Sequence, residues 1–226
     1  MSWLKLVGVL MDYPQDELWQ HGGELLEAAD DPILPAPRRT ALADFVRELL
    51  AADPLEAQER WLAMFDRGRS MSLLLFEHIH GESRDRGSAM IDLLQEYWKR
   101  DFDASAAELP DYVPLFLEFL SLLPADEALE LLGDAVHVLA TIGRKLDANG
   151  SPYATAFQVL EALSPVAAQE LAEPPVRDMD EAMEMFGPSM DGVEPLLKPG
   201  PQVAVVQMPA SRRQAAAAQS IDTRRI

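Results

Sequence analysis

The 226-residue chain has no cysteine, which excludes a disulfide framework, a zinc site built on thiolates and a cysteine nucleophile. The lack of cysteine also fits a reducing compartment. No run of about 20 apolar residues occurs, so no segment is expected to span a membrane. The apolar run at the N-terminus is short, and Asp12, Asp16 and Glu17 follow it closely, so it does not resemble a signal peptide.

Positive charge is scarce as well. The chain carries 19 Lys and Arg against 38 Asp and Glu, which gives a formal net charge of −19. A protein that binds nucleic acid needs a basic surface for the phosphates, so this composition argues against nucleic acid as a partner. It favours basic partners instead, through long-range attraction. The composition therefore predicts a soluble, acidic, cytoplasmic protein.

The chain divides into two unequal parts. Residues 1–173 carry 31 acids and 13 bases, whereas residues 174–226 carry seven acids, six bases and seven prolines. Apolar residues in the first part recur at helical spacing, and no alternating strand pattern is present. We therefore expect an all-α fold, with one irregular domain of about eight to nine helices over 1–173. The Pro-rich stretch 174–226 is expected to be a flexible C-terminal tail.

Turn residues indicate where several of these helices begin. Asp53 is expected to be the N-cap of a helix whose first residue is Pro54. A single helix is expected between Pro14 and Asp30. Ser70 is expected to cap a helical stretch that passes through Phe76 and ends at Gly81, and a strongly apolar helix is expected to open at Pro110-Asp111.

Motifs for catalysis are missing. The sequence contains neither the G-x-S-x-G elbow nor a glycine-rich phosphate loop, so we expect no enzyme and no catalytic residue. His78, His80 and Glu82 are candidate metal ligands. However, histidines two positions apart lie on different sides of a helix and would share an ion only from a loop. We expect neither a metal nor an intrinsic cofactor, and a small metalloprotein remains an alternative.

Four arginines flank the segment from Ser70 to Ser83. Such a set is able to clamp carboxylates or phosphates with paired hydrogen bonds. Pairing with nearby acids to fix a turn is the alternative, and surface pairs of this kind are common. The arginines are Arg67, Arg69, Arg84 and Arg86, and the nearby acids are Asp66, Glu77, Glu82 and Asp85.

Large apolar residues mark two expected helix ends. Trp61, Met64 and Phe65 share one helix face, a pattern typical of a core. Aromatics at helix ends beside Asp111 would also suit a groove for a helical peptide, with the carboxylate meeting a positive charge on that peptide.

The run Met64–Gly87 closely resembles the NarJ family, the assembly chaperones or delta subunits of respiratory nitrate reductase. The stretch Leu109–Leu115 resembles the same family, as do Asp12-Tyr13-Pro14 and Asp53-Pro54-Leu55. The resemblance covers about residues 3–165, and the two long motifs are specific.

The resemblance implies an all-helical chaperone of the wider TorD and DmsD group that is not part of the finished enzyme. Its partner would be the cofactor-free catalytic (alpha) subunit of nitrate reductase, or the alpha–beta complex, bound through the N-terminal segment of the catalytic subunit. The chaperone would hold this client ready for insertion of the molybdenum cofactor and delay its docking on the membrane subunit. Proteins of molybdenum cofactor biosynthesis are further expected partners, and membrane association would be only indirect.

The resemblance also suggests a client-peptide site. In the wider group this site includes a W-x-x-[hydrophobic]-F helix end and a Pro-Asp-His turn. Tyr112 stands here where His is usual, which keeps an aromatic body and a polar tip but removes imidazole chemistry. Leu115 and Glu118 are expected on an exposed edge that extends the groove. The predicted site is Trp61, Met64, Phe65, Pro110, Asp111, Tyr112, Leu115 and Glu118.

The remaining family-motif segment has no role that the sequence assigns. A direct carrier of molybdenum cofactor or nucleotide through Arg67–Arg86 is the alternative function. The segment's charged and ligating residues are Arg67, Arg69, Glu77, His78, His80, Glu82, Arg84 and Arg86.

Overall fold

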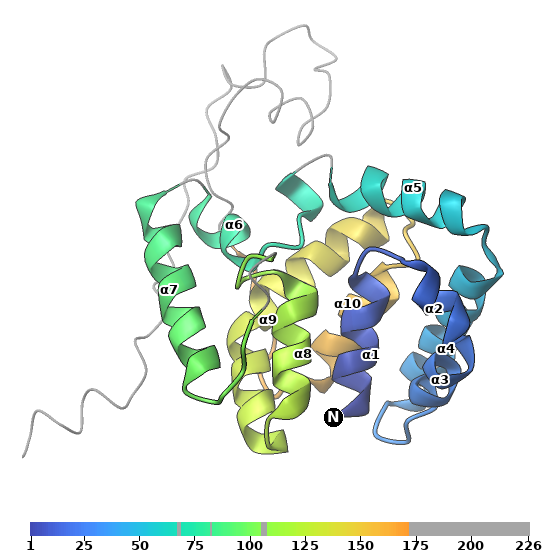
Figure 1. Ribbon diagram of the computed structural model, residues 1–226, viewed down its shortest axis with the longest axis horizontal. Helices are drawn as coiled ribbons and strands as arrows, with labels where there is room; N and C mark the ends of the chain where they lie inside the picture. Colours follow the sequence, from blue (N-terminus) through green and yellow to red (C-terminus); the bar gives the residue numbers. More distant parts are fainter. Residues whose placement is uncertain (67–68, 82, 105–107, 172–226) are drawn as a thin grey trace, which may run out of the picture.

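The computed structural model describes residues 1–66, 69–81, 83–104 and 108–171. This part of the chain is all-α, as predicted, apart from an isolated bridge between Leu74 and Tyr112 (Figure 1). The predicted tail 174–226 lies outside the described residues. The helices are α1 (Ser2–Met11), α2 (Asp16–Gln20), α3 (Gly22–Ala29), α4 (Ala36–Ala51), α5 (Pro54–Phe65), the 3₁₀ helix η1 (Arg69–Met71), α6 (Leu75–His80), α7 (Arg84–Trp98), α8 (Val113–Leu122), α9 (Ala125–Ala148) and α10 (Ala154–Leu163).

Four helices form the centre of the molecule. α1 packs along α8, and α9 packs along α10. The pair α9–α10 approaches closely at Gly143, where an added Cβ would lie 2.7 Å from the Cβ of Phe157. Asn149 is the C-cap of α9, and it is followed by Gly150 with a positive φ of 66°, the left-handed conformation that ends many helices.

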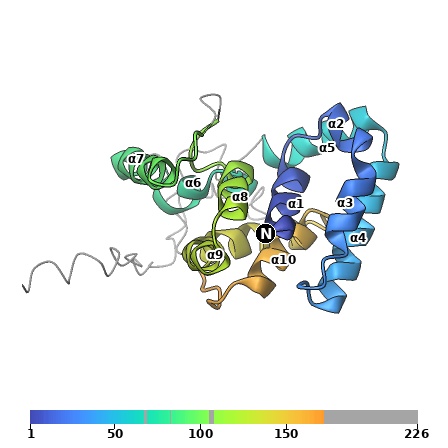
Figure 2. The same ribbon diagram turned by 60° about the horizontal axis from the view of Figure 1, so that its bottom comes forward.

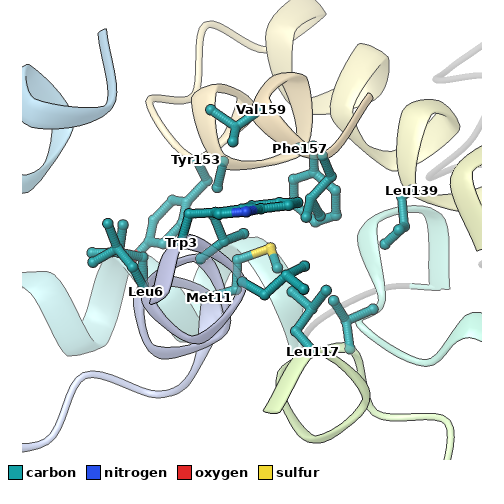
Figure 3. Close-up of a cluster of buried hydrophobic side chains, with 14 of the residues drawn as sticks. Trp3, Leu6, Met11, Leu117, Leu139, Tyr153, Phe157 and Val159 are labelled. Atoms are coloured by element: carbon teal, nitrogen blue, oxygen red, sulfur yellow. The ribbon is translucent and has the colours of Figure 1, made fainter. Parts of the chain in front are cut away.

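The centre of the core lies between these four helices, and the core continues onto α3 and α4. Trp3 on α1 is 1% exposed and sits among the side chains of α8, α9 and α10 (Figure 3). Its ring lies near Tyr153, Phe157 and Met11. Burial of large side chains is the main stabilising contribution to such a fold, at roughly 25 cal/mol per Å² of apolar surface.

Helices α2, α3 and α4 form one side of the molecule (Figures 1 and 2). The single helix expected between Pro14 and Asp30 is divided at His21, whose backbone is not helical. The break places Gly22 against α4, where an added Cβ would lie 2.9 Å from the Leu50 side chain. The sequence spacing did not reveal the break because leucines on both sides keep the same period.

Two helices lie at the periphery. α5 runs along one end of the molecule, and only Ala57 and Phe65 of its residues are buried. α7 lies at the side beyond α6, and only Tyr97 of its residues is buried (Figure 2). Asp53 caps α5 as predicted, since its carboxylate accepts hydrogen bonds from the backbone N–H groups of Leu55 at 3.0 Å and Glu56 at 3.3 Å.

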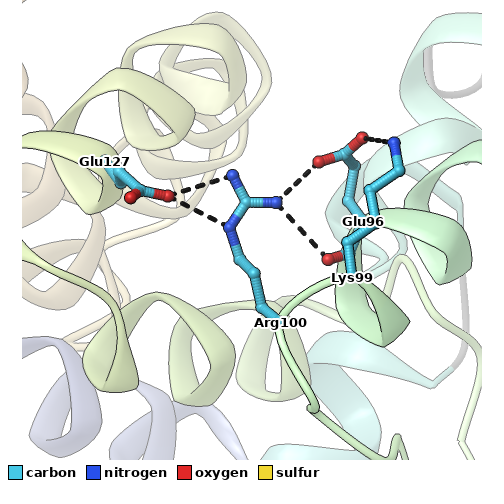
Figure 4. Close-up of polar contacts among 4 residues, drawn as sticks. All are labelled: Glu96, Lys99, Arg100 and Glu127. Carbon is cyan, nitrogen blue, oxygen red and sulfur yellow. Dashed lines mark hydrogen bonds and ion pairs between the residues drawn. The ribbon is translucent and has the colours of Figure 1, made fainter.

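The C-terminal end of α7 is fixed to α9 by charge. The guanidinium of Arg100 contacts Glu127 at the start of α9 (3.0 Å) and Glu96 on α7 (2.6 Å), as Figure 4 shows. Lys99 lies 2.6 Å from the other carboxylate oxygen of Glu96. Hydrogen bonds from Lys99 and Arg100 hold the pKa of Glu96 below its ordinary value.

Two expected helix starts are placed differently. The stretch expected after Ser70 is a 3₁₀ helix followed by α6, which begins only at Leu75. Pro110 and Asp111 precede α8 and lie in a turn that pairs with the chain before α6.

Within the described residues, no helix is long and apolar enough to cross a membrane.

Candidate functional site

Several motif residues meet at the C-terminal end of α1. The indole N–H of Trp61 donates to the carbonyl oxygen of Met11 at 2.9 Å, and its ring meets that of Tyr13 edge-on at 5.4 Å between centroids. The hydroxyl of Tyr112 donates to the carboxylate of Asp12 at 2.8 Å. The turn after α1 therefore holds both α5 and the loop before α8.

The inner face of α5 carries the predicted Trp61, Met64 and Phe65. Phe65 is buried and packs against Tyr153 with ring centroids 5.1 Å apart. Trp61 and Met64 are half-buried against the same core. This face is therefore largely part of the core, and only the half-buried side chains leave surface at the end of the molecule.

Asp111 is fully buried and accepts hydrogen bonds from the start of α6. Its carboxylate accepts a hydrogen bond from the N–H of Phe76 at 3.0 Å, and its carbonyl oxygen accepts one from Leu75 at 3.0 Å. The N–H of Val113 donates to the carbonyl of Leu73 at 2.8 Å. Burial raises the pKa of the Asp111 carboxyl, and the Phe76 N–H and Arg86 act against this rise.

The expected exposure at this turn is therefore partly wrong. Asp111 is 0% exposed, so in this structure its carboxylate does not face a groove. Leu115 is also buried, because it faces the core from α8, whereas Glu118 is exposed as expected. A role for these residues in peptide binding remains a prediction, and direct contact by Asp111 or Leu115 would require a change of structure.

The other two residues of the turn are held by neighbouring side chains. Pro110 is buried, and its carbonyl oxygen accepts a hydrogen bond from the hydroxyl of Tyr97 at 2.7 Å. Tyr112 is half-buried, and burial together with the Asp12 carboxylate raises the pKa of its phenol. Sequence reasoning missed Tyr97, because a tyrosine at an apolar helix position does not reveal which carbonyl its hydroxyl meets.

Arg86 joins the start of α7 to two carboxylates. One guanidinium nitrogen lies 3.7 Å from Glu77 and another 3.9 Å from Asp111. The other oxygen of Glu77 accepts a hydrogen bond from the hydroxyl of Ser72 at 2.5 Å. The sequence left open whether the arginines pair with nearby acids. For Arg86 and Glu77, the structure shows this pairing.

The histidines of the motif lie on α6. His78 is buried, with its Nε2 2.8 Å from the carbonyl oxygen of Ser72, so this nitrogen carries a proton and donates it. His80 is half-buried, and its ring packs near that of Phe76 at 6.0 Å. In the described part of the chain, no three His, Asp or Glu side chains are grouped as a metal would require. Glu82, the third predicted ligand, lies outside it.

The structure describes the side chains of only two of the four arginines in the predicted clamp. Arg86 points to the carboxylates of Glu77 and Asp111, and Arg84 is exposed on the first turn of α7. Arg67 lies outside the described residues, as does the side chain of Arg69.

An all-helical body whose motif residues hold its helices together defines the class of an all-α domain. Comparisons with known proteins then identify the family of the chain. The model of the nitrate reductase delta subunit family matches residues 31–158, which is more than half of the chain. The chain belongs to this family.

Three relatives illustrate the similarity. The nitrate reductase molybdenum cofactor assembly chaperone NarJ of Escherichia coli K12 is 44% identical over 193 residues, which cover 84% of this chain and 80% of NarJ. The probable assembly chaperone NarW of the same strain is 45% identical over 166 residues, covering 73% and 68%. The probable assembly chaperone NarJ of Bacillus subtilis 168 is 28% identical over 165 residues, covering 73% and 89%. These relatives support a chaperone role.

Proposed function

We propose that this protein is an assembly chaperone of respiratory nitrate reductase, which binds the N-terminal segment of the catalytic subunit before that subunit receives its molybdenum cofactor. The observation that carries the proposal is the 44% identity over 193 residues to an assembly chaperone of this enzyme. The protein needs no cofactor of its own for this role, since the molybdenum cofactor enters the client.

The proposed action rests on differential binding. A chaperone that holds the cofactor-free client and then leaves must bind that form more tightly than the loaded form, because a ligand shifts an equilibrium only by its difference in affinity. While it is bound, it delays docking of the client on the membrane subunit. It acts in the cytoplasm, where the cofactor is supplied, and proteins of cofactor biosynthesis are its further partners.

The surface of the described part suits a helical, basic client segment. Most residues of α5 are exposed, three are half-buried, and only Ala57 and Phe65 are buried. Half-buried rings of Tyr13, Trp61 and Tyr112 border the same end of the molecule. Amphipathic helices bind such surfaces through apolar side chains at helical spacing. The net charge of −19 attracts a basic segment over distances of about a Debye length.

The buried motif residues have a supporting role in this proposal. Asp111 and Pro110 hold the start of α6 and the end of α7 at the turn before α8, through the hydrogen bonds with Phe76 and Tyr97. They position the surface and do not need to touch the client.

The test uses the full chain and the cofactor-free catalytic subunit, with and without its N-terminal segment. Size-exclusion chromatography with light scattering should show a stable complex with the intact subunit. The complex should be lost when the segment is deleted. An equally stable complex with the shortened subunit would contradict the proposed mode of binding.

A further inference from the structure

The outer face of α7 carries an exposed apolar stripe. Ile91 is 57% exposed and Trp98 is 61% exposed, on a helix of which only Tyr97 is buried. At 100° per residue, Ile91 and Trp98 lie on one face, and the half-buried Leu94 lies at the edge of that face. Gly87, one turn before Ile91, has nothing within 4 Å of an added Cβ, so the surface there is open. The stripe therefore has room for a second helix.

The charge around this stripe differs from the charge of the rest of the body. Residues 84–100 carry four bases and three acids, whereas the rest of residues 1–173 carries nine bases and 28 acids. Arg84 and Lys99 are exposed at the two ends of the stripe, and the exposed Asp92 lies on one flank. An acidic segment is therefore repelled less at this stripe than over most of the body.

A pair of exposed leucines with the same spacing lies on α5, in a more acidic setting. Leu55 is 64% exposed and Leu62 is 39% exposed. Residues 53–66 carry four acids and one base. An acidic helix with apolar residues at this spacing therefore favours α7 over α5, because like charges oppose its approach to α5.

A segment of this kind follows in the same chain, beyond the described residues. Four large apolar residues recur there at helical spacing: Val176, Met179, Met183 and Phe186. Met179 and Phe186 are seven positions apart, as are the two exposed residues of the α7 stripe. Residues 176–186 carry four acids and one base, two prolines precede them, and Gly187-Pro188 follows them. This pattern predicts a short, acidic, amphipathic helix.

The described part of the chain ends within reach of α7. The backbone N–H of Gln169 donates to Nδ1 of His137 on α9 at 3.0 Å, and Leu171 packs against the core. α6 packs on α9, and α7 lies beyond α6 (Figure 2). Packed helices are roughly 8–10 Å apart, so α7 lies roughly two such spacings from α9. Residues 172–178 span up to roughly 25 Å when extended, which is enough to bring Met179 to the stripe.

We propose that residues 176–186 dock on the outer face of α7 as a helix, with their apolar side on the Ile91–Trp98 stripe and their acids toward Arg84 and Lys99. Because the segment belongs to the same chain, its effective concentration at α7 is on the order of millimolar, and a weak contact is enough to hold it. The docked segment covers the stripe and withholds it from other proteins. This inference does not depend on the proposed function.

Amide hydrogen exchange of the full chain, followed by mass spectrometry, tests the docking. Amides of residues 179–186 should exchange at least tenfold more slowly in the parent than in Ile91→Ser/Trp98→Ser, which lacks the apolar surface on α7. Leu55→Ser/Leu62→Ser changes the equivalent pair on α5 and should leave the exchange of residues 179–186 within about twofold of the parent. Circular dichroism of both variants checks that the fold is kept. Equal exchange of residues 179–186 in the parent and in the α7 variant would overturn the inference.

Quenching of Trp98 fluorescence by acrylamide gives a second readout that leaves the helical body unchanged. The signal of Trp98 is the difference between each protein and its Trp98→Phe counterpart. Met179→Ser/Met183→Ser/Phe186→Ser should raise the quenching of Trp98 at least twofold, because the indole becomes uncovered. As a matched control, Val203→Ser/Val205→Ser/Val206→Ser removes three apolar side chains further along the chain and should leave the quenching unchanged.

Other occupants of the stripe give different results. If the Val203 control uncovers Trp98 and the Met179 variant does not, a later stretch of the chain covers α7, and the inference is overturned. If light scattering shows a dimer that Ile91→Ser/Trp98→Ser separates into monomers, a second copy covers the stripe, which also overturns it. Equal quenching of Trp98 in the parent and in both serine variants would show that neither stretch covers the stripe, with the same consequence.

Discussion

Asp111 shows how a single residue can look like a ligand contact and serve the fold. Its carboxylate is fully buried and accepts the N–H of Phe76 at the start of α6. We expect Asp111→Ala to lower the free energy of unfolding by about 1–3 kcal/mol, because a buried N–H would lose its acceptor. Urea unfolding measures this loss. A variant as stable as the parent would contradict the fastening role.

The buried carboxyl of Asp111 makes the free energy of unfolding depend on pH, and the direction of this dependence follows from its pKa. Burial raises the pKa of its carboxyl in the folded state, so folding favours the protonated form. The stability that this group contributes is complete below its unfolded pKa and is lost as pH rises through the folded pKa. Relative to Asp111→Asn, the parent protein should therefore gain stability as pH falls from 7 toward 4. Urea unfolding of both proteins over this range should show the divergence, and parallel curves would exclude it.

Trp61 supplies a second prediction at the scale of one residue. Trp61→Phe keeps an aromatic ring beside Tyr13 and Phe65 but removes the hydrogen bond to the carbonyl of Met11. The free energy of unfolding should fall by about 1 kcal/mol. Thermal unfolding followed by circular dichroism would detect it, and unchanged stability would mean that the hydrogen bond contributes nothing.

Helix packing gives the next prediction, at the scale of elements. Gly143→Ala should lower the free energy of unfolding by about 1–3 kcal/mol, because the new Cβ meets Phe157 at 2.7 Å and α10 must shift. Gly87→Ala is the matched control on α7, where nothing lies within 4 Å of the added Cβ. That change should raise stability by up to about 1 kcal/mol through helix propensity. Equal effects at the two sites would contradict the packing of α9 on α10.

The loose attachment of α7 can be tested by amide hydrogen exchange. Only Tyr97 of α7 is buried, and its C-terminal end is fixed to α9 through Arg100 and Glu127. Amides of α7 should exchange faster than those of α9 and α10, because local opening exposes few buried groups. Arg100→Ala should speed exchange in α7 and leave α10 unchanged. Uniform acceleration across the chain would indicate a global loss of stability instead.

The sequence predicted most of the helices because their signals are local. The cap at Asp53 depends on residues a few positions apart, and it is confirmed. The division at His21 and the start of α6 at Leu75 depend on contacts with distant segments, with Leu50 on α4 and with Asp111. Periodicity carries no signal of such contacts.

The sequence predicted which motif residues share a helix face or a turn, but not how deeply each of them is buried. Helical spacing grouped Trp61, Met64 and Phe65 on one face of α5 and favoured a core role for that face, and the structure packs it against the core. Asp111 looked accessible because charged residues are mostly exposed. Its burial results from the pairing of its turn with the chain before α6, a contact between residues 35 positions apart.

At the scale of the whole molecule, charge and shape work together in the proposed role. The helical body presents α5 at one end and α7 at one side, and its net charge of −19 favours a basic client.

The most direct test of the central claim compares two forms of the same client. The dissociation constant of the full chain would be measured by surface plasmon resonance for the cofactor-free catalytic subunit and for the cofactor-loaded subunit. The proposed role predicts at least tenfold tighter binding to the cofactor-free form, about 1.4 kcal/mol of preference. Equal affinity for the two forms, or tighter binding to the loaded form, would contradict a chaperone that releases its client after cofactor insertion.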